Sequence, residues 1–193
     1  MALVTLGPGI VLAIGLGALL NPDSVTGPVP ALGWLLLVVF LTTPLQSAAE
    51  EYLFRGYLSQ AVAGWFRSHR TGALITGVLT ATLFSLAHAP PDFLTFLDRF
   101  VFALAASATV YLTGGLEAAI VLHAVNNVIV FLLAGLLGDG VATEQVPEGA
   151  GALLVLVTLL SMAAYVALVA RSRERLRPEV RTAAQDLRPA LAR

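Results

Sequence analysis

Three short segments of an otherwise apolar chain carry side chains that could do chemistry together. The first, AAEEYLFRG at 48–56, places two adjacent carboxylates, Glu50 and Glu51, one helical turn before Arg55. Residues four apart lie on one face of a helix, so Glu51 and Arg55 can form an ion pair. Glu50 is rotated by about 100° from Glu51, and one arginine neutralises only one carboxylate. Glu50 therefore needs a proton or an external partner.

The other two segments repeat the spacing of four residues around a histidine. FSLAH places Phe84 before His88, and HAVNN places His123 before Asn127, with Asn126 offset by about 100°. Each segment taken alone has a purely structural interpretation. The acid and the arginine can be a structural ion pair, a histidine can donate to a backbone carbonyl, and asparagines can hold membrane helices together.

Together, a carboxylate, two imidazoles and an amide are the groups needed to hold and deprotonate a water molecule. Histidine and glutamate are common zinc ligands, and zinc-bound water ionises near neutral pH. Glu50, His88 and His123 are therefore the candidate ligands for a divalent metal such as zinc. Without a metal, a carboxylate in an apolar cavity can itself be the general base. His123 or Asn127 could then stabilise the oxyanion of a tetrahedral intermediate.

The composition makes these polar side chains conspicuous. Of 193 residues, 58% are hydrophobic and 12% are charged, whereas soluble domains have about 25% charged residues. Lipid is therefore the expected solvent, and there an ionisable side chain costs at least about 2.5–3.5 kcal/mol at a helix centre. The net charge of −1 argues against nucleic acid as a partner, and the absence of cysteine excludes disulfides and a cysteine nucleophile.

Long apolar runs separated by Gly, Pro or polar stretches predict an all-α fold, a bundle of about six transmembrane helices enclosing a polar cavity. The first run has no basic n-region, so it is interpreted as a retained span and not as a signal peptide. Pro44 should kink or divide the second helix, and Glu117 should favour the dipole at the start of the fifth. The expected helices are 2–20, 31–63, 73–88, 94–112, 116–137 and 151–170.

The arginine distribution predicts the domain limits and the orientation. All eleven basic residues are arginine, and seven lie at 171–193. Residues 1–170 are expected to form the membrane domain, with its motif core at 48–130, and 171–193 an Arg-rich cytoplasmic tail. An even number of crossings separates this tail from the basic 67–70 loop, where His69 should be solvated, so both termini are predicted to be cytoplasmic. We expect a multi-pass protein of the inner (plasma) membrane, and the Arg-for-Lys bias is typical of a GC-rich bacterial genome.

The three segments also resemble a known family. EEYLFR is similar to the EExxxR motif of the CPBP (Abi) family of intramembrane proteases, which includes the type II CAAX prenyl endopeptidases. FSLAH and HAVNN resemble that family's FxxxH and HxxxN motifs and follow in the same order. The resemblance implies hydrolysis of a peptide bond of a peptide or protein substrate within the membrane. There is no HExxH motif, so thermolysin-like chemistry is not expected.

The resemblance also implies a role for each matched residue. Glu50 would activate the water, and Glu51 and Arg55 would supply supporting charges. His88 would help to hold the water or a metal. His123 and Asn127 would complete the site and bind the oxyanion.

Two other classes of function stay open. The same fold could serve as a non-catalytic membrane scaffold or a bacteriocin-immunity factor. A proton-coupled transporter is the third class, because buried Glu and His also form proton relays. The short chain without an internal repeat argues against a transporter. The sequence does not indicate the oligomeric state.

The protease hypothesis requires Glu50, His88 and His123 to meet at one depth. At 1.5 Å per residue, Glu50 and His88 lie roughly 21–24 Å from the loops expected on the cytoplasmic side, and His123 only about 12 Å. Either the turn at 113–115 lies within the bilayer thickness, buried by neighbouring helices, or the expected helix boundaries are wrong.

Overall fold

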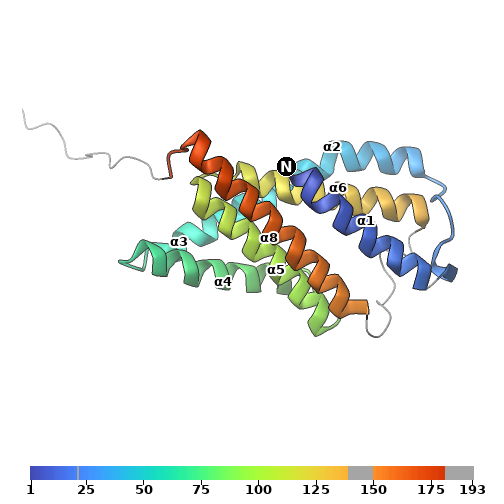
Figure 1. Cartoon of the computed structure of the whole chain (residues 1–193), viewed down its shortest axis with the longest axis horizontal. Helices are drawn as coiled ribbons and strands as arrows, with labels where there is room; N and C mark the ends of the chain where they lie inside the picture. The colour runs from blue at the N-terminus through green and yellow to red at the C-terminus, as the bar shows by residue number, and fades with distance from the viewer. Residues whose placement is uncertain (21, 139–149, 181–193) are drawn as a thin grey trace, which may run out of the picture.

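The computed structural model describes residues 1–20, 22–138 and 150–180, and the secondary structure of this part is entirely helical (Figure 1). Six helices in it are long and apolar enough to cross a membrane, which confirms the predicted all-α membrane bundle. They are α1 (Ala2–Leu20), α2 (Leu32–Glu51) continuing through η2 (Tyr52–Leu58) and α3 (Ser59–Ala63), α4 (His69–Ala87), α5 (Phe93–Thr113), α6 (Glu117–Leu137) and α8 (Ala150–Leu176). A short 3-10 helix, η1 (Pro22–Ser24), follows α1.

Two boundaries differ from the expected ones by more than two residues, and the expected undivided range 31–63 of the second helix is confirmed. Pro44 lies inside α2 and does not divide it, because a membrane helix tolerates the carbonyl group that proline leaves unpaired. Helix α4 begins at His69, inside the predicted basic loop, because the Ser68 side chain caps it by accepting the Thr71 N–H at 3.3 Å. Helix α8 continues to Leu176, so the start of the predicted tail is helical, and residues 181–193 lie outside the described part.

The long helix that carries the first motif changes its geometry directly after Glu51. Residues Tyr52–Leu58 form a π-helix, and the Ser59 hydroxyl donates to the Phe54 carbonyl at 2.9 Å, five residues back. Wide π-turns are rare and occur frequently at functional sites. The sequence pattern did not predict this one.

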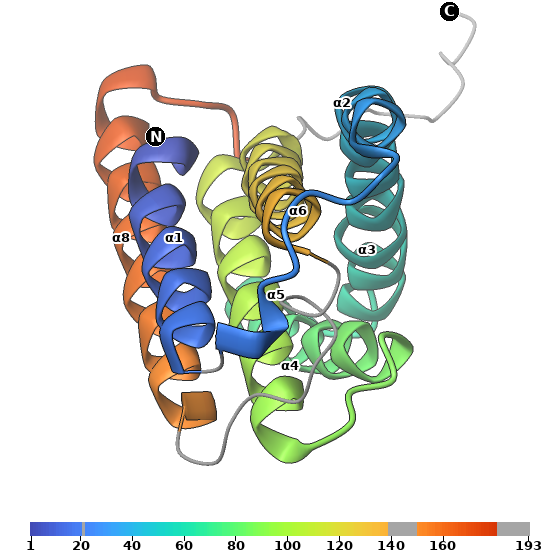
Figure 2. The ribbon, with the colours of Figure 1, turned by 90° about the vertical axis from the view of Figure 1, so that its right-hand side faces the viewer.

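The helices enclose the two motif glutamates from several sides. Figure 2 shows α1 and α8 side by side, α5 and α6 in the middle, α2 and α3 on the opposite side, and α4 below them. Small buried residues of α5, such as Ala103 and Ala106, let its neighbours approach closely. The buried aromatic side chains Phe54, Phe84 and Phe102 belong to one core cluster, and this cluster lies against the site described below.

Candidate active site

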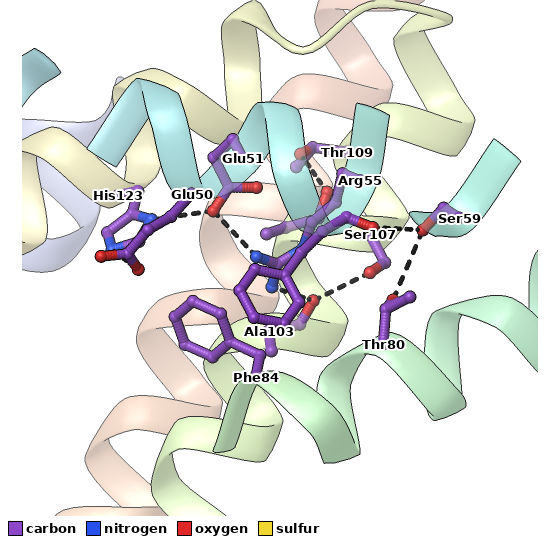
Figure 3. A network of polar contacts seen from close by, with 12 residues as sticks. Glu50, Glu51, Arg55, Ser59, Thr80, Phe84, Ala103, Ser107, Thr109 and His123 are labelled. Carbon is purple, nitrogen blue, oxygen red and sulfur yellow. Dashed lines mark hydrogen bonds and ion pairs between the residues drawn. The ribbon is translucent and has the colours of Figure 1, made fainter. Parts of the chain in front are cut away.

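A buried network of charges surrounds Glu51. One carboxylate oxygen, Oε1, accepts hydrogen bonds from Arg55 Nη1 at 3.0 Å and from His123 Nδ1 at 2.8 Å (Figure 3). All three side chains are at most 2% exposed. Arg55 Nη2 also donates to the Ala103 carbonyl of α5 at 3.1 Å. The ion pair predicted from the spacing of Glu51 and Arg55 is therefore present, and it ties α2 to both α5 and α6.

These contacts fix the tautomers of the two motif histidines. His123 Nδ1 faces a carboxylate that is already paired with an arginine, so this nitrogen carries the proton. His88 Nδ1 lies 2.8 Å from the Phe84 backbone carbonyl, which can only accept. In the neutral rings, both Nε2 atoms consequently present a lone pair.

Glu50 faces these two lone pairs. Its Oε2 atom lies 3.8 Å from His88 Nε2 and 3.8 Å from His123 Nε2, distances too long for hydrogen bonds. Its other oxygen accepts from Gln46 Nε2 at 3.1 Å, whereas Oε2 has no hydrogen-bond partner among the described residues. Three acceptors thus face one point, which suits a group that donates two protons, such as water, or a cation.

The site opens on the side of Glu50 and His88. Their side chains are 23% and 37% exposed, whereas that of His123 is 2% exposed. His123 and Glu51 therefore form the closed floor of the site. A substrate would approach from the side of Glu50 and His88.

Phe84 links the motif residues through its ring as well as its carbonyl group. The ring centroid lies 4.4 Å from that of His88, 5.6 Å from that of His123 and 4.7 Å from the Arg55 guanidinium carbon. The last contact has the geometry of a cation–π interaction. Phe102 packs edge-on against His123 at 5.1 Å. Both the carbonyl group and the ring of Phe84 therefore orient His88.

Helix α5 holds the end of α4 in place. Arg99 Nη1 donates to the His88 carbonyl at 3.1 Å, and the Ser85 hydroxyl donates to the Phe96 carbonyl at 2.8 Å. His88 is the C-terminal cap of α4, where backbone carbonyls need external donors. Sequence reasoning missed Arg99, Phe102 and Gln46. The only signal for Gln46 was its position one turn before Glu50.

The remaining predicted residues lie near these groups or at the helix ends. The Oδ1 atom of Asn127 accepts from Asn126 Nδ2 at 3.2 Å, and the oxyanion role of Asn127 stays a prediction. Glu117 is the first residue of α6, where a carboxylate favours the dipole. His69 is exposed and stacks on Tyr111 with ring centroids 5.4 Å apart.

The convergence of the three motifs resolves the question of depth. Figure 1 shows the turn before α6 nearer the middle of the long axis than the turn between α3 and α4. His123 therefore reaches Glu50 although it lies only six residues from the start of α6. The offset of the two turns along the bundle accounts for the meeting, whereas the expected burial of the 113–115 turn is wrong, because Gly114 is exposed.

The residues predicted to bind a metal have suitable donor atoms but not a suitable spacing. Glu50, His88 and His123 offer one oxygen and two nitrogens, and both rings have an oxygen partner on Nδ1, as metal-binding histidines usually do. Donor atoms around a tetrahedral zinc lie about 3.3 Å apart, whereas both oxygen–nitrogen distances here are 3.8 Å. Across the described ranges, no group of three or more acidic or histidine side chains is placed to hold a metal ion. A divalent metal stays a prediction.

A family comparison agrees with the motifs and the fold. The model of the type II CAAX prenyl endopeptidase Rce1-like family matches residues 31–129, a stretch that includes all three motifs. The chain belongs to this family and shares its helical, membrane-embedded architecture. Searches among curated proteins and among solved structures found no match.

Proposed function

We propose that the protein is an intramembrane endopeptidase that hydrolyses a peptide bond with a water molecule activated by Glu50. The observation that carries the proposal is the position of Glu50 Oε2, 3.8 Å from each of two imidazole Nε2 atoms. Because all three atoms are acceptors, a water molecule between them can donate its protons to two of them. Its oxygen lone pairs then point away from the two acceptors and are free to attack a carbonyl carbon.

The catalytic step uses Glu50 as the general base and then as the general acid. Water attacks the scissile carbonyl carbon while its proton moves to Glu50 Oε2, which gives a tetrahedral intermediate with an oxyanion. Asn127, one turn after His123 on the same face of α6, is the proposed donor to this oxyanion. When the carbon–nitrogen bond breaks, the protonated Glu50 gives its proton to the leaving amine, and the carboxylate is regenerated.

The other charged residues hold this arrangement in place. Glu51 keeps His123 in the tautomer whose Nε2 accepts from water, and Arg55 balances the charge of Glu51. The Phe84 carbonyl does the same for His88. Zinc bound by Glu50, His88 and His123 is the alternative, and it would require the donors to move closer together, so no step is assigned to it.

The proposed substrate is a membrane-associated peptide or protein. The family name points to a prenylated C-terminal CAAX sequence as the first substrate to test. We also propose that both termini are cytoplasmic. The 64–68 turn and the Arg-rich end of α8 lie toward the same end of the bundle in Figure 1, which supports this orientation.

The test uses the full chain in proteoliposomes and an internally quenched peptide that ends in a prenylated CAAX sequence. We expect Glu50→Gln to lower the cleavage rate by about 10²–10⁴-fold, as for loss of a general base, with an unchanged melting temperature. Glu174→Gln, in the last turns of α8, is the matched control and should cleave normally. Cleavage by Glu50→Gln at the wild-type rate would refute the mechanism. A wild-type protein that cuts neither this peptide nor other membrane peptides would favour the scaffold.

A further inference from the structure

Ser47 of α2 is a buried polar residue that the proposed mechanism does not use. Its side chain is 0% exposed, and its hydroxyl has no hydrogen-bond partner among the described residues. Other hydroxyls in these helices donate to the carbonyl group four residues back, as those of Thr76, Thr80 and Thr113 do, each at 2.8 Å. The Ser47 hydroxyl makes no such bond. A buried hydroxyl without a partner is unfavourable, so its orientation needs an explanation.

The packing of α2 against α6 indicates which residue should lie opposite Ser47. The two helices are antiparallel, because Leu35 packs on Gly135 at one end of the contact and Glu51 binds His123 at the other. Ser47 lies one turn before Glu51. In an antiparallel pair, the residue one turn after His123 faces that turn, and this residue is Asn127. Helix α6 is the main packing partner of α2 as a whole, so α6 is the helix that we expect to cover the serine.

Ser47 and Asn127 have complementary hydrogen-bonding groups. The amide oxygen of Asn127 is already used, because it accepts from Asn126. The amide nitrogen carries two N–H groups, and a serine oxygen can accept one of them. Such a bond would give the Ser47 oxygen the partner that it lacks among the described residues.

We propose that Ser47 is a positioning residue for Asn127. Its Oγ accepts one N–H of the Asn127 amide and thereby directs the second N–H toward the space beside Glu50 and His123. The inference rests on the proposed function, because that space is where the oxyanion would form. Ser47 itself is completely buried and does not touch the substrate.

The test compares two substitutions of the same shape. Ser47→Thr keeps the hydroxyl, and Ser47→Val replaces it by a methyl group, so the steric cost of the added branch is equal in both. With the quenched CAAX peptide, we expect Ser47→Val to have a kcat about three- to tenfold below that of Ser47→Thr, the effect of one hydrogen bond. The KM values should agree within about twofold, because the oxyanion forms only in the transition state.

A second measurement observes the amide directly. The chain contains three asparagines, at 21, 126 and 127, so selective ¹⁵N-asparagine labelling gives three side-chain NH₂ groups in an NMR spectrum. Asn127→Asp assigns the signal of interest. We expect the Asn127 NH₂ signals to shift between Ser47→Thr and Ser47→Val.

The outcomes separate this inference from the proposed function. Equal kcat values for the threonine and valine variants, together with unchanged Asn127 signals, would overturn the role of Ser47 while Glu50 stayed essential. If Glu50→Gln cleaved normally, the proposed function would fail. The Asn127 signals would then still decide whether the two side chains are bonded.

Discussion

The Nδ1–H of His123 and an Arg55 N–H both donate to one oxygen of Glu51, at 2.8 and 3.0 Å. This shared oxygen connects the first motif to the third. It sets the tautomer of His123 and so leaves Nε2 of that ring as an acceptor facing Glu50. In the proposed mechanism, the second glutamate of the first motif therefore acts through His123, and the first acts on the water.

This relationship predicts that Glu51→Gln is more damaging to stability than substitution of Glu50. Removing the Glu51 charge leaves the buried Arg55 guanidinium without its closest counter-ion, a change that typically costs about 3–5 kcal/mol. We expect a clearly lower melting temperature in detergent for Glu51→Gln than for Glu50→Gln. The double variant Glu51→Gln/Arg55→Met should recover part of the loss, because it removes both charges. A double variant as unstable as the sum of the two single variants would show that the pair is not coupled.

Substitution of Phe84 is predicted to lower activity by more than the loss of a buried side chain would explain. Its ring contacts His88, His123 and the Arg55 guanidinium, so Phe84→Leu removes the cation–π contact and loosens both imidazoles. The lost aromatic contacts are worth about 1–2 kcal/mol. We expect a fall in kcat of about tenfold or more that a shift in melting temperature does not explain.

Phe100→Leu is the matched control for this variant. Phe100 stacks on Phe96 in α5, and no aromatic contact to either motif histidine is described for it. Its substitution should reduce stability with little effect on kcat. An equal loss of kcat in both variants would indicate general loosening of the helical core instead of a role for the Phe84 ring.

Asp92 is predicted to make the stability of α5 depend on pH. Its carboxylate caps the helix by accepting the Thr95 backbone N–H at 2.8 Å and the Thr95 hydroxyl at 2.9 Å, and these bonds lower the pKa of Asp92 below its ordinary value. A lowered folded-state pKa contributes stability above the unfolded value, near pH 4, and the contribution is lost as the pH falls through the folded value. Asp92→Asn keeps a capping oxygen but does not titrate.

The measurement is the melting temperature of both proteins in detergent from pH 3 to pH 7. We expect the wild type to be more stable than Asp92→Asn at neutral pH, with the difference shrinking as the solution becomes more acidic than about pH 4. A difference that stays constant over the whole range would show that the charge of Asp92 does not support the cap.

Much of the fold could be predicted from the sequence, because apolar length and breaker residues determine where membrane helices begin and end. The six spans and the Glu51–Arg55 pair follow from this pattern and from helical spacing. The π-helix at Tyr52–Leu58 did not follow, because no residue type signals a wide turn. The contact of Arg55 with the Ala103 carbonyl could not be predicted either. It joins residues 48 positions apart, and its acceptor is a backbone carbonyl, a group that every residue has.

In the site, too, the sequence predicted relations within a helix but not those between helices. Spacing within each helix predicted which side chains share a face, and the structure brings Glu50, His88 and His123 to 3.8 Å contacts between helices. The tautomers and the role of Arg99 depend on which helices are neighbours, which spacing cannot show. Ser68 was a usable signal in the sequence, because serine is a preferred residue at the N-cap of a helix. Its side chain accepts the backbone N–H of Thr71, three residues later, and a cap at Ser68 predicts the observed start of α4 at His69.

Removal of metal ions provides the last prediction, because the site combines zinc-type donors with a spacing that is too wide for zinc. We expect the protein to keep its activity on the quenched peptide after dialysis against EDTA and 1,10-phenanthroline, because a water that donates to two of the three acceptors needs no cation. Elemental analysis of the same sample measures how much metal is left. The control is Glu50→Gln, which should be inactive before and after dialysis. Activity that is lost on dialysis and restored by zinc, with one zinc per chain, would show that the donors close around a metal ion and that the protein is a metalloprotease.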